Sequence, residues 1–174
     1  MDLEERVAEL ERRLAVLEER GGDGSSAGAV AGREADGGDF WALEGLKGRL
    51  AEGGAEAGGV LFTGAVRAPT GLRYEWQYGL TTDAVLDADW SAAAESFAAL
   101  GQAVRLRLLR EILDGRDTVA ALTELDGIGT TGQIYHHLRQ LSAAGWLHTP
   151  ARGHYEIPAV RVVPLLVMLA AAQP

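Results

Sequence analysis

The chain has 174 residues, of which 47% are hydrophobic, so it is long enough for one ordinary core or two small ones. It contains no cysteine, which excludes disulfides, thiolate zinc sites and thiol-based redox sensing. The formal net charge is −9, and residues 1–97 hold nineteen acidic against nine basic side chains, whereas residues 98–174 hold six against seven. This balance excludes a chain that binds polyanions over its whole surface, but not a local nucleic-acid face in the carboxy-terminal part.

The amino terminus predicts neither export nor membrane insertion. Residues 1–13, MDLEERVAELERR, carry charges where a signal peptide needs an apolar stretch. The longest apolar run, VVPLLVMLAAA at residues 162–172, is shorter than the roughly 20 residues that span a bilayer. We therefore expect a soluble cytoplasmic protein without membrane contact. Its fifteen arginines against a single lysine, Lys47, are typical of a GC-rich bacterial genome.

Residues 1–20 carry the apolar seam of a heptad repeat, in which the a and d positions are Leu3, Val7, Leu10, Leu14 and Leu17. Every e position is glutamate and every g position is arginine, so two parallel copies would pair Arg6 of one helix with Glu11 of the other. A single amphipathic helix packed on its own domain is the alternative, although it needs no such charge order. Because fewer than three heptads make a marginal helix, we expect this segment to reinforce a dimer formed elsewhere.

Residues 21–38, GGDGSSAGAVAGREADGG, lack an apolar period and predict a flexible linker that reaches about 24 Å on average. Residues 39–97 follow as a region containing a helix and a β-hairpin. Asp39 is a suitable N-cap for a helix whose apolar positions are Phe40, Leu43, Leu46 and Leu50. A glycine-rich break separates this helix from the hairpin.

The hairpin is predicted from residues 59–67 and 72–80, joined by the turn sequence Ala-Pro-Thr-Gly. The second strand alternates strictly, and one of its faces consists of Leu72, Tyr74, Trp76, Tyr78 and Leu80. Such a ladder is more often the buried face of a sheet than the lining of a ligand pocket. Because a lone hairpin needs a partner surface, we expect it to pack on the helix after Asp39 or on a helix within residues 87–102. The pattern leaves open whether the hairpin binds a small-molecule effector, contacts a protein effector or only braces the fold.

Residues 98–174 show the densest helical pattern. The stretch LGQAVRLRLLREILDG at residues 100–115 predicts an amphipathic helix that is stopped by Gly115, with Leu100, Val104, Leu108 and Ile112 inward. A second helix is expected to begin with Asp117 as its N-cap. A third, capped by Thr130 or Thr131, runs to Ala144 before Gly145 ends it. Two short strands around a tight turn then follow, with Arg152 at the tip.

The third helix has two contrasting faces. Ile134, Leu138 and Leu141 recur at spacings of four and three and form a stripe that should be buried. His136 and Arg139 fall on the opposite side, and the flanks carry Gln133, Tyr135 and His137, of which we expect His137 to be partly buried and structural. No Asp or Glu occurs between Gly127 and Tyr155. A helix of this composition is typical of one that meets phosphates and base edges.

The segments LGQAVRLRLLREILDG, TVAALTEL, IYHHLRQLSAAGWL and RGHYEI together resemble the ArsR-type winged helix-turn-helix regulators of bacteria, over about residues 98–172. The resemblance implies a homodimeric DNA-binding transcriptional regulator, usually a repressor, that reads a palindrome with one recognition helix per half-site. The residues it places against bases are Thr131, Gln133 and His136, with Tyr135 as a further candidate. Arg139 would hold a phosphate, and Arg152 and His154 on the wing would approach the backbone or the minor groove.

Metal sensing does not carry over from the family. Many members use cysteine pairs or acidic and histidine ligands on the last helix, whereas this chain has no cysteine and its last apolar segment offers no ligand. His136 and His137 are adjacent and point about 100° apart on a helix, so they cannot both face one ion. The chain also lacks a phosphate-binding loop, a nucleophile elbow and paired carboxylates beside a histidine. We expect no metal, no cofactor and no enzyme activity.

The last segment, PAVRVVPLLVMLAAA at residues 158–172, is apolar on most sides and needs burial on more than one of them. We expect it to dock on the first helix of the winged domain and on its copy in a second subunit, through Leu165, Leu166 and Leu169. Pro164 should kink or restart this helix.

The sequence thus predicts a mostly helical α+β chain, with a coiled-coil helix at 1–20, a linker at 21–38, a helix and hairpin region at 39–97 and a winged helix-turn-helix domain at 98–174. The expected partners are double-stranded DNA and a second copy of the chain. The competing interpretation is a winged helix that contacts protein and binds little DNA, because the acidic remainder of the chain opposes a polyanion.

Overall fold

The computed structural model describes residues 40–173. The predicted coiled coil, the linker and Asp39 lie outside this range. Trp41–Pro174 forms one compact unit. The boundary expected between residues 97 and 98 falls inside a helix of this unit, Trp90–Leu100, whose last two residues are buried in its core.

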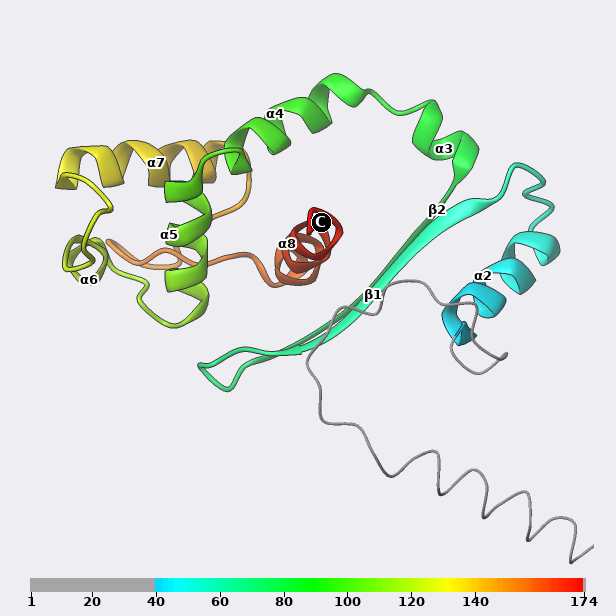
Figure 1. Cartoon of the computed structure of the whole chain (residues 1–174), viewed down its shortest axis with the longest axis horizontal. Helices are drawn as coiled ribbons and strands as arrows, with labels where there is room; N and C mark the ends of the chain where they lie inside the picture. Colours follow the sequence, from blue (N-terminus) through cyan, green and yellow to red (C-terminus); the bar gives the residue numbers. More distant parts are fainter. Residues whose placement is uncertain (1–39, 174) are drawn as a thin grey trace, which may run out of the picture. The chain divides into compact units, whose positions relative to one another are not determined.

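The described residues form a mostly helical α+β unit with one two-stranded antiparallel sheet (Figure 1). In chain order the elements are α2 (Trp41–Glu52), β1 (Gly59–Arg67), β2 (Arg73–Thr81), α3 (Thr82–Leu86), α4 (Trp90–Leu100), α5 (Ala103–Leu113), α6 (Val119–Thr123), α7 (Thr131–Ala143) and α8 (Ala159–Ala171). The coarse class expected from the sequence, α+β and mostly α, is confirmed.

The hairpin forms as predicted. β1 pairs with β2 in a register that runs from Gly59 opposite Thr81 to Arg67 opposite Arg73. The turn closes through a hydrogen bond of 2.8 Å from the Gly71 amide to the Ala68 carbonyl, and Gly71 adopts a φ of 86° that favours glycine. Both strand runs and the turn chemistry were local signals, which is why the sequence located them.

Helices cover the two faces of the hairpin. α8 approaches one face so closely that a Cβ added to Gly64 would lie 2.6 Å from the Cγ1 of Val163. α2 packs on the opposite face, where a Cβ added to Gly59 would lie 3.0 Å from the Cδ2 of Leu50. Of the two partner helices that the sequence offered, the one after Asp39 packs on the hairpin, whereas the sequence did not identify α8 as the other partner.

The core lies between the end of α4 and helices α5, α6, α7 and α8. Its fully buried residues include Leu108 of α5 and the α7 stripe of Ile134, Leu138 and Leu141, all at 0% exposure. Trp146, which follows α7, is also buried and donates from its indole Nε1 to Ser96 Oγ at 3.1 Å. Its ring is covered by the Arg161 guanidinium at 4.9 Å, which joins α8 to the same cluster.

Two expectations about helix boundaries are wrong, and at Pro164 one of the two expected outcomes, a kink or a restart, is excluded. The helix predicted over residues 100–115 is divided, because Gly101 ends α4 and Gln102 is extended at φ −123° and ψ 128° before α5. The N-cap of α6 is Thr118 rather than Asp117, and its hydroxyl accepts from the Ala121 amide. α8 continues through Pro164, so the expected restart does not occur.

Two antiparallel bridges tie the segment after α7 to the rest of the unit. Thr118 bridges His154, and His148 bridges Glu156. The two short strands expected after α7 are therefore reduced to single bridging residues around a turn. We refer to residues 148–156 as the 148–156 loop.

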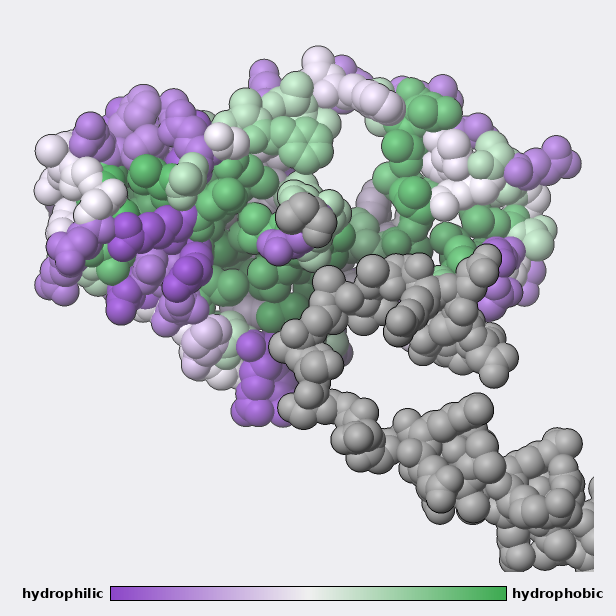
Figure 2. Space-filling model, in the orientation of Figure 1, coloured by the Kyte–Doolittle hydropathy of each residue, from purple (hydrophilic) through white to green (hydrophobic). Residues whose placement is uncertain are grey.

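The unit leaves many large apolar side chains exposed. Trp76, Tyr78 and Leu80 of the aromatic ladder are exposed, so most of the ladder is not covered by the described residues. Further examples are Trp41, Leu86, Trp90 and Phe97, each at least 60% exposed. Figure 2 shows hydrophobic residues reaching the surface over α4 and along the hairpin. Within residues 40–173, no element covers these side chains.

Candidate nucleic-acid interface

Helix α7 is anchored at its start by a capping box. The Thr130 hydroxyl accepts from the Gln133 amide at 3.4 Å, and the Gln133 Oε1 accepts from the Thr130 amide at 2.8 Å. Gly129, which precedes the N-cap Thr130, adopts a φ of 104° that favours glycine and forms the turn before the helix. At the other end Gly145 adopts φ of 72° and ends the helix where the sequence predicted.

The two faces of α7 are arranged as its spacing predicted. Ile134, Leu138 and Leu141 are buried, and the opposite face exposes Thr131, Tyr135, His136 and Arg139. The exposed fraction of Tyr135 is 47%. No carboxylate lies on this helix or on the 148–154 segment that follows it. The exposed face therefore offers donors, a cation and an aromatic ring with no charge that would repel a phosphate.

Gln133 lies on the exposed surface, but its side-chain oxygen is occupied by the cap. The sequence placed Gln133 among the base-reading residues, and this hydrogen bond gives it a structural task as well. Only its amide nitrogen remains to meet a base edge without breaking the cap.

His137 is half-buried between the two faces of α7, as expected. Its Nδ1 is buried and has no hydrogen-bond partner within residues 40–173. Burial lowers the pKa of His137, and the charges of Arg105 and His136 lower it further. Both effects favour the neutral form of the His137 ring.

Arg105 of α5 lies near His137 of α7, Arg107 of α5 contacts the turn before α7, and the sequence did not single out either arginine. Arg107 donates from Nη1 to the Asp126 carbonyl at 2.7 Å and so holds the turn that connects α6 to α7. Arg105 is only 6% exposed, and its Nε lacks a hydrogen-bond partner among the described residues. Both arginines lie in an amphipathic pattern that is equally typical of a solvated helix face, so the sequence carried no signal for these roles.

The 148–156 loop is held at its base by two histidine–carboxylate pairs. His154 Nδ1 lies 2.9 Å from Asp117 Oδ2, and the Asp117 carbonyl accepts from the Tyr155 amide at 2.8 Å. His148 Nε2 lies 3.6 Å from Glu156 Oε2. Arg152 is exposed at the tip of the loop. Of the two predicted wing contacts, Arg152 is presented to solvent, whereas the His154 ring is engaged with Asp117.

The residues predicted for dimerisation fall into two groups. Leu165 is buried, and Leu166 and Leu169 are half-buried on α8. Together with three leucines of α5 and the α5 arginines Arg107 and Arg110, they line a largely apolar groove of about 480 Å³. The five heptad positions lie in residues 1–20, outside the described range.

Two features are absent from residues 40–173. No helix in this range combines the length and apolar character needed to cross a bilayer. No three potential metal ligands from His, Asp and Glu come together there.

No protein-family model, curated protein or solved structure matches this chain.

Proposed function

We propose that the chain is a sequence-specific DNA-binding transcriptional regulator, a homodimeric repressor that reads an inverted repeat without sensing a metal. In this proposal residues 98–172 act as an ArsR-type winged helix-turn-helix. α6 and α7 are the helix-turn-helix pair, α7 enters the major groove, and the 148–156 loop is the wing. The order of α5, the bridge at Thr118, α6, α7, the two bridged segments and α8 supports this interpretation.

The observation that carries the proposal is the exposed face of α7. In a chain of net charge −9, this helix presents Tyr135, His136 and Arg139 to solvent with no carboxylate among them. A helix that only braced a core would have no reason to avoid acids on its outer face. Arg139 makes no ion pair within residues 40–173 and can hold a phosphate, and His136 and Thr131 can reach base edges.

Dimerisation through α8 would supply two recognition helices. The groove between α5 and α8 is lined by Leu106, Leu109 and Leu113 on one side and by Leu165, Leu166 and Leu169 on the other. A second copy of the chain is its proposed occupant, because the charge order of residues 4–20 favours parallel self-pairing and would hold a second copy close. Each recognition helix would then bind one half-site weakly, and the two contacts made by one dimer would together give specific affinity for the inverted repeat.

Selection of genomic fragments by the purified full chain tests DNA binding. We expect an inverted repeat to be enriched and its affinity to fall steeply with salt. Arg139→Ala and Arg152→Ala should each reduce the salt slope by about one, because each removes a phosphate contact. Arg49→Ala on α2 is the matched control, since Arg49 is also an exposed arginine but lies far from α7 in the chain. If Arg139→Ala and Arg152→Ala both keep the salt dependence of the parent chain's DNA affinity, the proposed DNA-binding face is wrong.

A second candidate is a winged helix used for protein contact, and the exposed apolar surface of the hairpin and α4 favours it. This surface belongs to other elements than the polar face of α7, so one chain can use both. The two candidates differ in salt dependence. Undetectable or salt-independent DNA binding would support the protein-contact function alone.

A further inference from the structure

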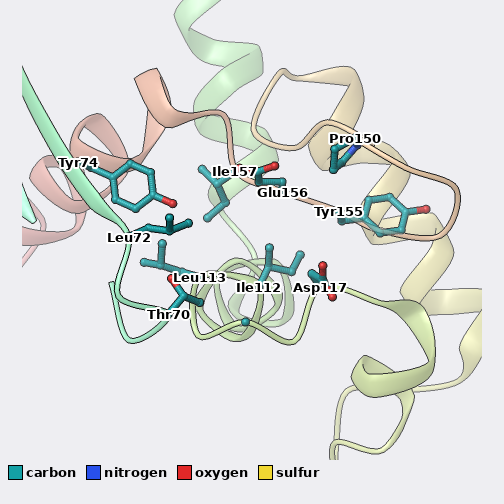
Figure 3. A pocket seen from close by; sticks show the side chains of 11 residues that line it. Thr70, Leu72, Tyr74, Ile112, Leu113, Asp117, Pro150, Tyr155, Glu156 and Ile157 are labelled. Atoms are coloured by element: carbon teal, nitrogen blue, oxygen red, sulfur yellow. The ribbon is translucent and has the colours of Figure 1, made fainter. Parts of the chain in front are cut away.

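A cavity of about 340 Å³ lies between the tip of the hairpin, the end of α5 and the base of the 148–156 loop. Leu72 and Tyr74 of the hairpin form one wall, and Asp117 and Glu156 lie across from them (Figure 3). The hairpin tip lies close to the end of α5 here, since a Cβ added to Gly115 would lie 3.2 Å from the Thr70 Cγ2. The volume is within the roughly 300–1,000 Å³ of small-molecule sites.

The lining combines apolar, aromatic and acidic groups. Leu72, Ile112 and Ile157 supply the apolar part, and Tyr74 directs its hydroxyl toward the interior (Figure 3). Asp117 and Glu156 supply two carboxylates, and no lysine, arginine or histidine is among the lining residues. The pKa of Tyr74 is raised by burial and then by the charge of Glu156, which agrees with a negative potential inside the cavity.

We propose that this cavity binds a small organic cation, a protonated amine carried on an apolar or aromatic body. The ammonium would pair with Glu156 and Asp117. The apolar or aromatic body of the ligand would lie against Leu72, Ile112 and the ring of Tyr74. An anion would meet two carboxylates, and no lysine or arginine lines the cavity to attract it. A neutral apolar ligand of the same shape would gain no charge-assisted hydrogen bond.

The site is built into the anchors of the 148–156 loop. Asp117 also pairs with His154 at 2.9 Å, and Glu156 lies 3.6 Å from His148. An ammonium on these carboxylates competes with the two histidines and loosens the base of the loop that carries Arg152. Binding of the cation is therefore coupled to DNA binding and weakens it. This regulatory step rests on the proposed function, whereas the binding step does not.

Calorimetric titration of the full chain without DNA tests the site, with phenethylammonium as the probe. 2-Phenylethanol is the neutral counterpart, and phenylacetate is the anionic one. We expect saturable binding of the ammonium that is at least about tenfold tighter than that of the alcohol, and no binding of the carboxylate. Equal affinity for the ammonium and the alcohol, or no saturable binding of the ammonium, would overturn the proposal.

Two variants separate loss of the site from loss of the fold. Glu156→Gln keeps the shape but removes one charge and should weaken phenethylammonium binding about tenfold. Glu95→Gln, an exposed carboxylate on α4, is its control and should bind as the parent does. Leu72→Trp changes a residue that is 55% exposed and should fill the cavity and abolish binding without unfolding the chain. Unchanged affinity in both Glu156→Gln and Leu72→Trp would also overturn the site.

The selected DNA repeat, titrated with and without saturating phenethylammonium, tests the coupling. We expect the affinity for DNA to fall at least about fivefold, and by reciprocity the ammonium should bind the DNA complex more weakly. If the DNA affinity is unchanged while the ammonium still binds, the coupling is refuted and the cation-binding site still stands. Ammonium binding by a chain that does not bind DNA would refute the proposed function and leave the site.

Discussion

At the scale of single residues, His137 should make the free energy of unfolding depend on pH. Its pKa is lowered in the folded chain by burial, while the unfolded chain titrates near the ordinary value of about 6.5. Between these two pKa values the unfolded state binds more protons than the folded state. The free energy of unfolding should therefore fall as pH decreases from about 7 through 6.5 and level off below the folded pKa of His137.

Urea unfolding of the full chain between about pH 5 and pH 7.5 measures this dependence. In His137→Leu, the free energy of unfolding should fall less on acidification than in the parent chain. Tyr135→Phe serves as the control, since Tyr135 is exposed on the same helix and is not among the groups that shift the pKa of His137. The same dependence in the parent and in His137→Leu would show that the buried ring is not its source.

Two glycines three residues apart, Gly129 just before the N-cap of α7 and Gly132 inside the helix, should respond oppositely to alanine. A Cβ added to Gly132 meets no described atom within 4 Å, so Gly132→Ala should stabilise the chain by about 1 kcal/mol. At Gly129, φ is 104° and the added Cβ would lie 2.6 Å from the Gln133 Oε1 that completes the capping box. Gly129→Ala should destabilise the chain by about 1–3 kcal/mol. Thermal and urea unfolding measure both, and equal signs would contradict this account of the cap.

At the scale of elements, the contact of Gly64 with Val163 fixes how α8 lies on the hairpin. Gly64→Ala should cost about 1–3 kcal/mol, because the new methyl group would overlap the Val163 side chain. Removing that side chain as well, in Gly64→Ala with Val163→Ala, should recover part of the loss relative to the sum of the single changes. Gly48→Ala is the control, since its Cβ meets no described atom within 4 Å. Additive losses in the urea-unfolding cycle would mean that the two residues do not constrain each other.

The elements that the sequence located correctly are those with local signals. The hairpin has strict alternation and a proline–glycine turn, and α7 has an apolar stripe, a threonine cap and a terminal glycine. The α6 cap was missed by one residue because Asp117 and Thr118 are both good N-caps, and the pairing of Asp117 with His154 decides between them. That pairing joins segments far apart in sequence and leaves no periodic trace.

The packing of α8 on the hairpin escaped prediction for a related reason. A glycine inside a strand is read locally as a weakness, whereas Gly64 is the position that admits Val163 of α8. The exposed face of α7 was predictable because spacing alone fixes which side of a helix is buried. The engagement of Gln133 in the cap was not predicted for the candidate site, although the capping-box spacing from Thr130 was visible in the sequence.

At the scale of the whole molecule, the described unit has more apolar surface than it can cover. α8 already packs on the hairpin, yet Val160 is 50% exposed, and Leu166 and Leu169 line an open groove together with residues of α5. The exposed part of the aromatic ladder adds Trp76, Tyr78 and Leu80. Burial of such surfaces contributes about 25 cal/mol for each Å² of apolar area, so a second copy that covered them would be strongly favoured.

Self-association is therefore predicted to depend more on α8 than on the heptad repeat. Leu166→Glu would bury a charge in the groove between α5 and α8, and in sedimentation equilibrium it should weaken the dimer by about a hundredfold or more. Arg6→Glu with Arg13→Glu turns g–e attraction into repulsion between surface charges and should weaken the dimer only about tenfold.

Adding a copy that carries Glu11→Arg and Glu18→Arg to the Arg6→Glu, Arg13→Glu chain should restore association, because the opposed charges again attract in a parallel pair. Asp87→Asn, at an exposed position outside both surfaces, is the control for loss of charge. A dimer that survives Leu166→Glu but dissociates on the heptad exchange would reverse the order of the two surfaces and make residues 1–20 the primary contact.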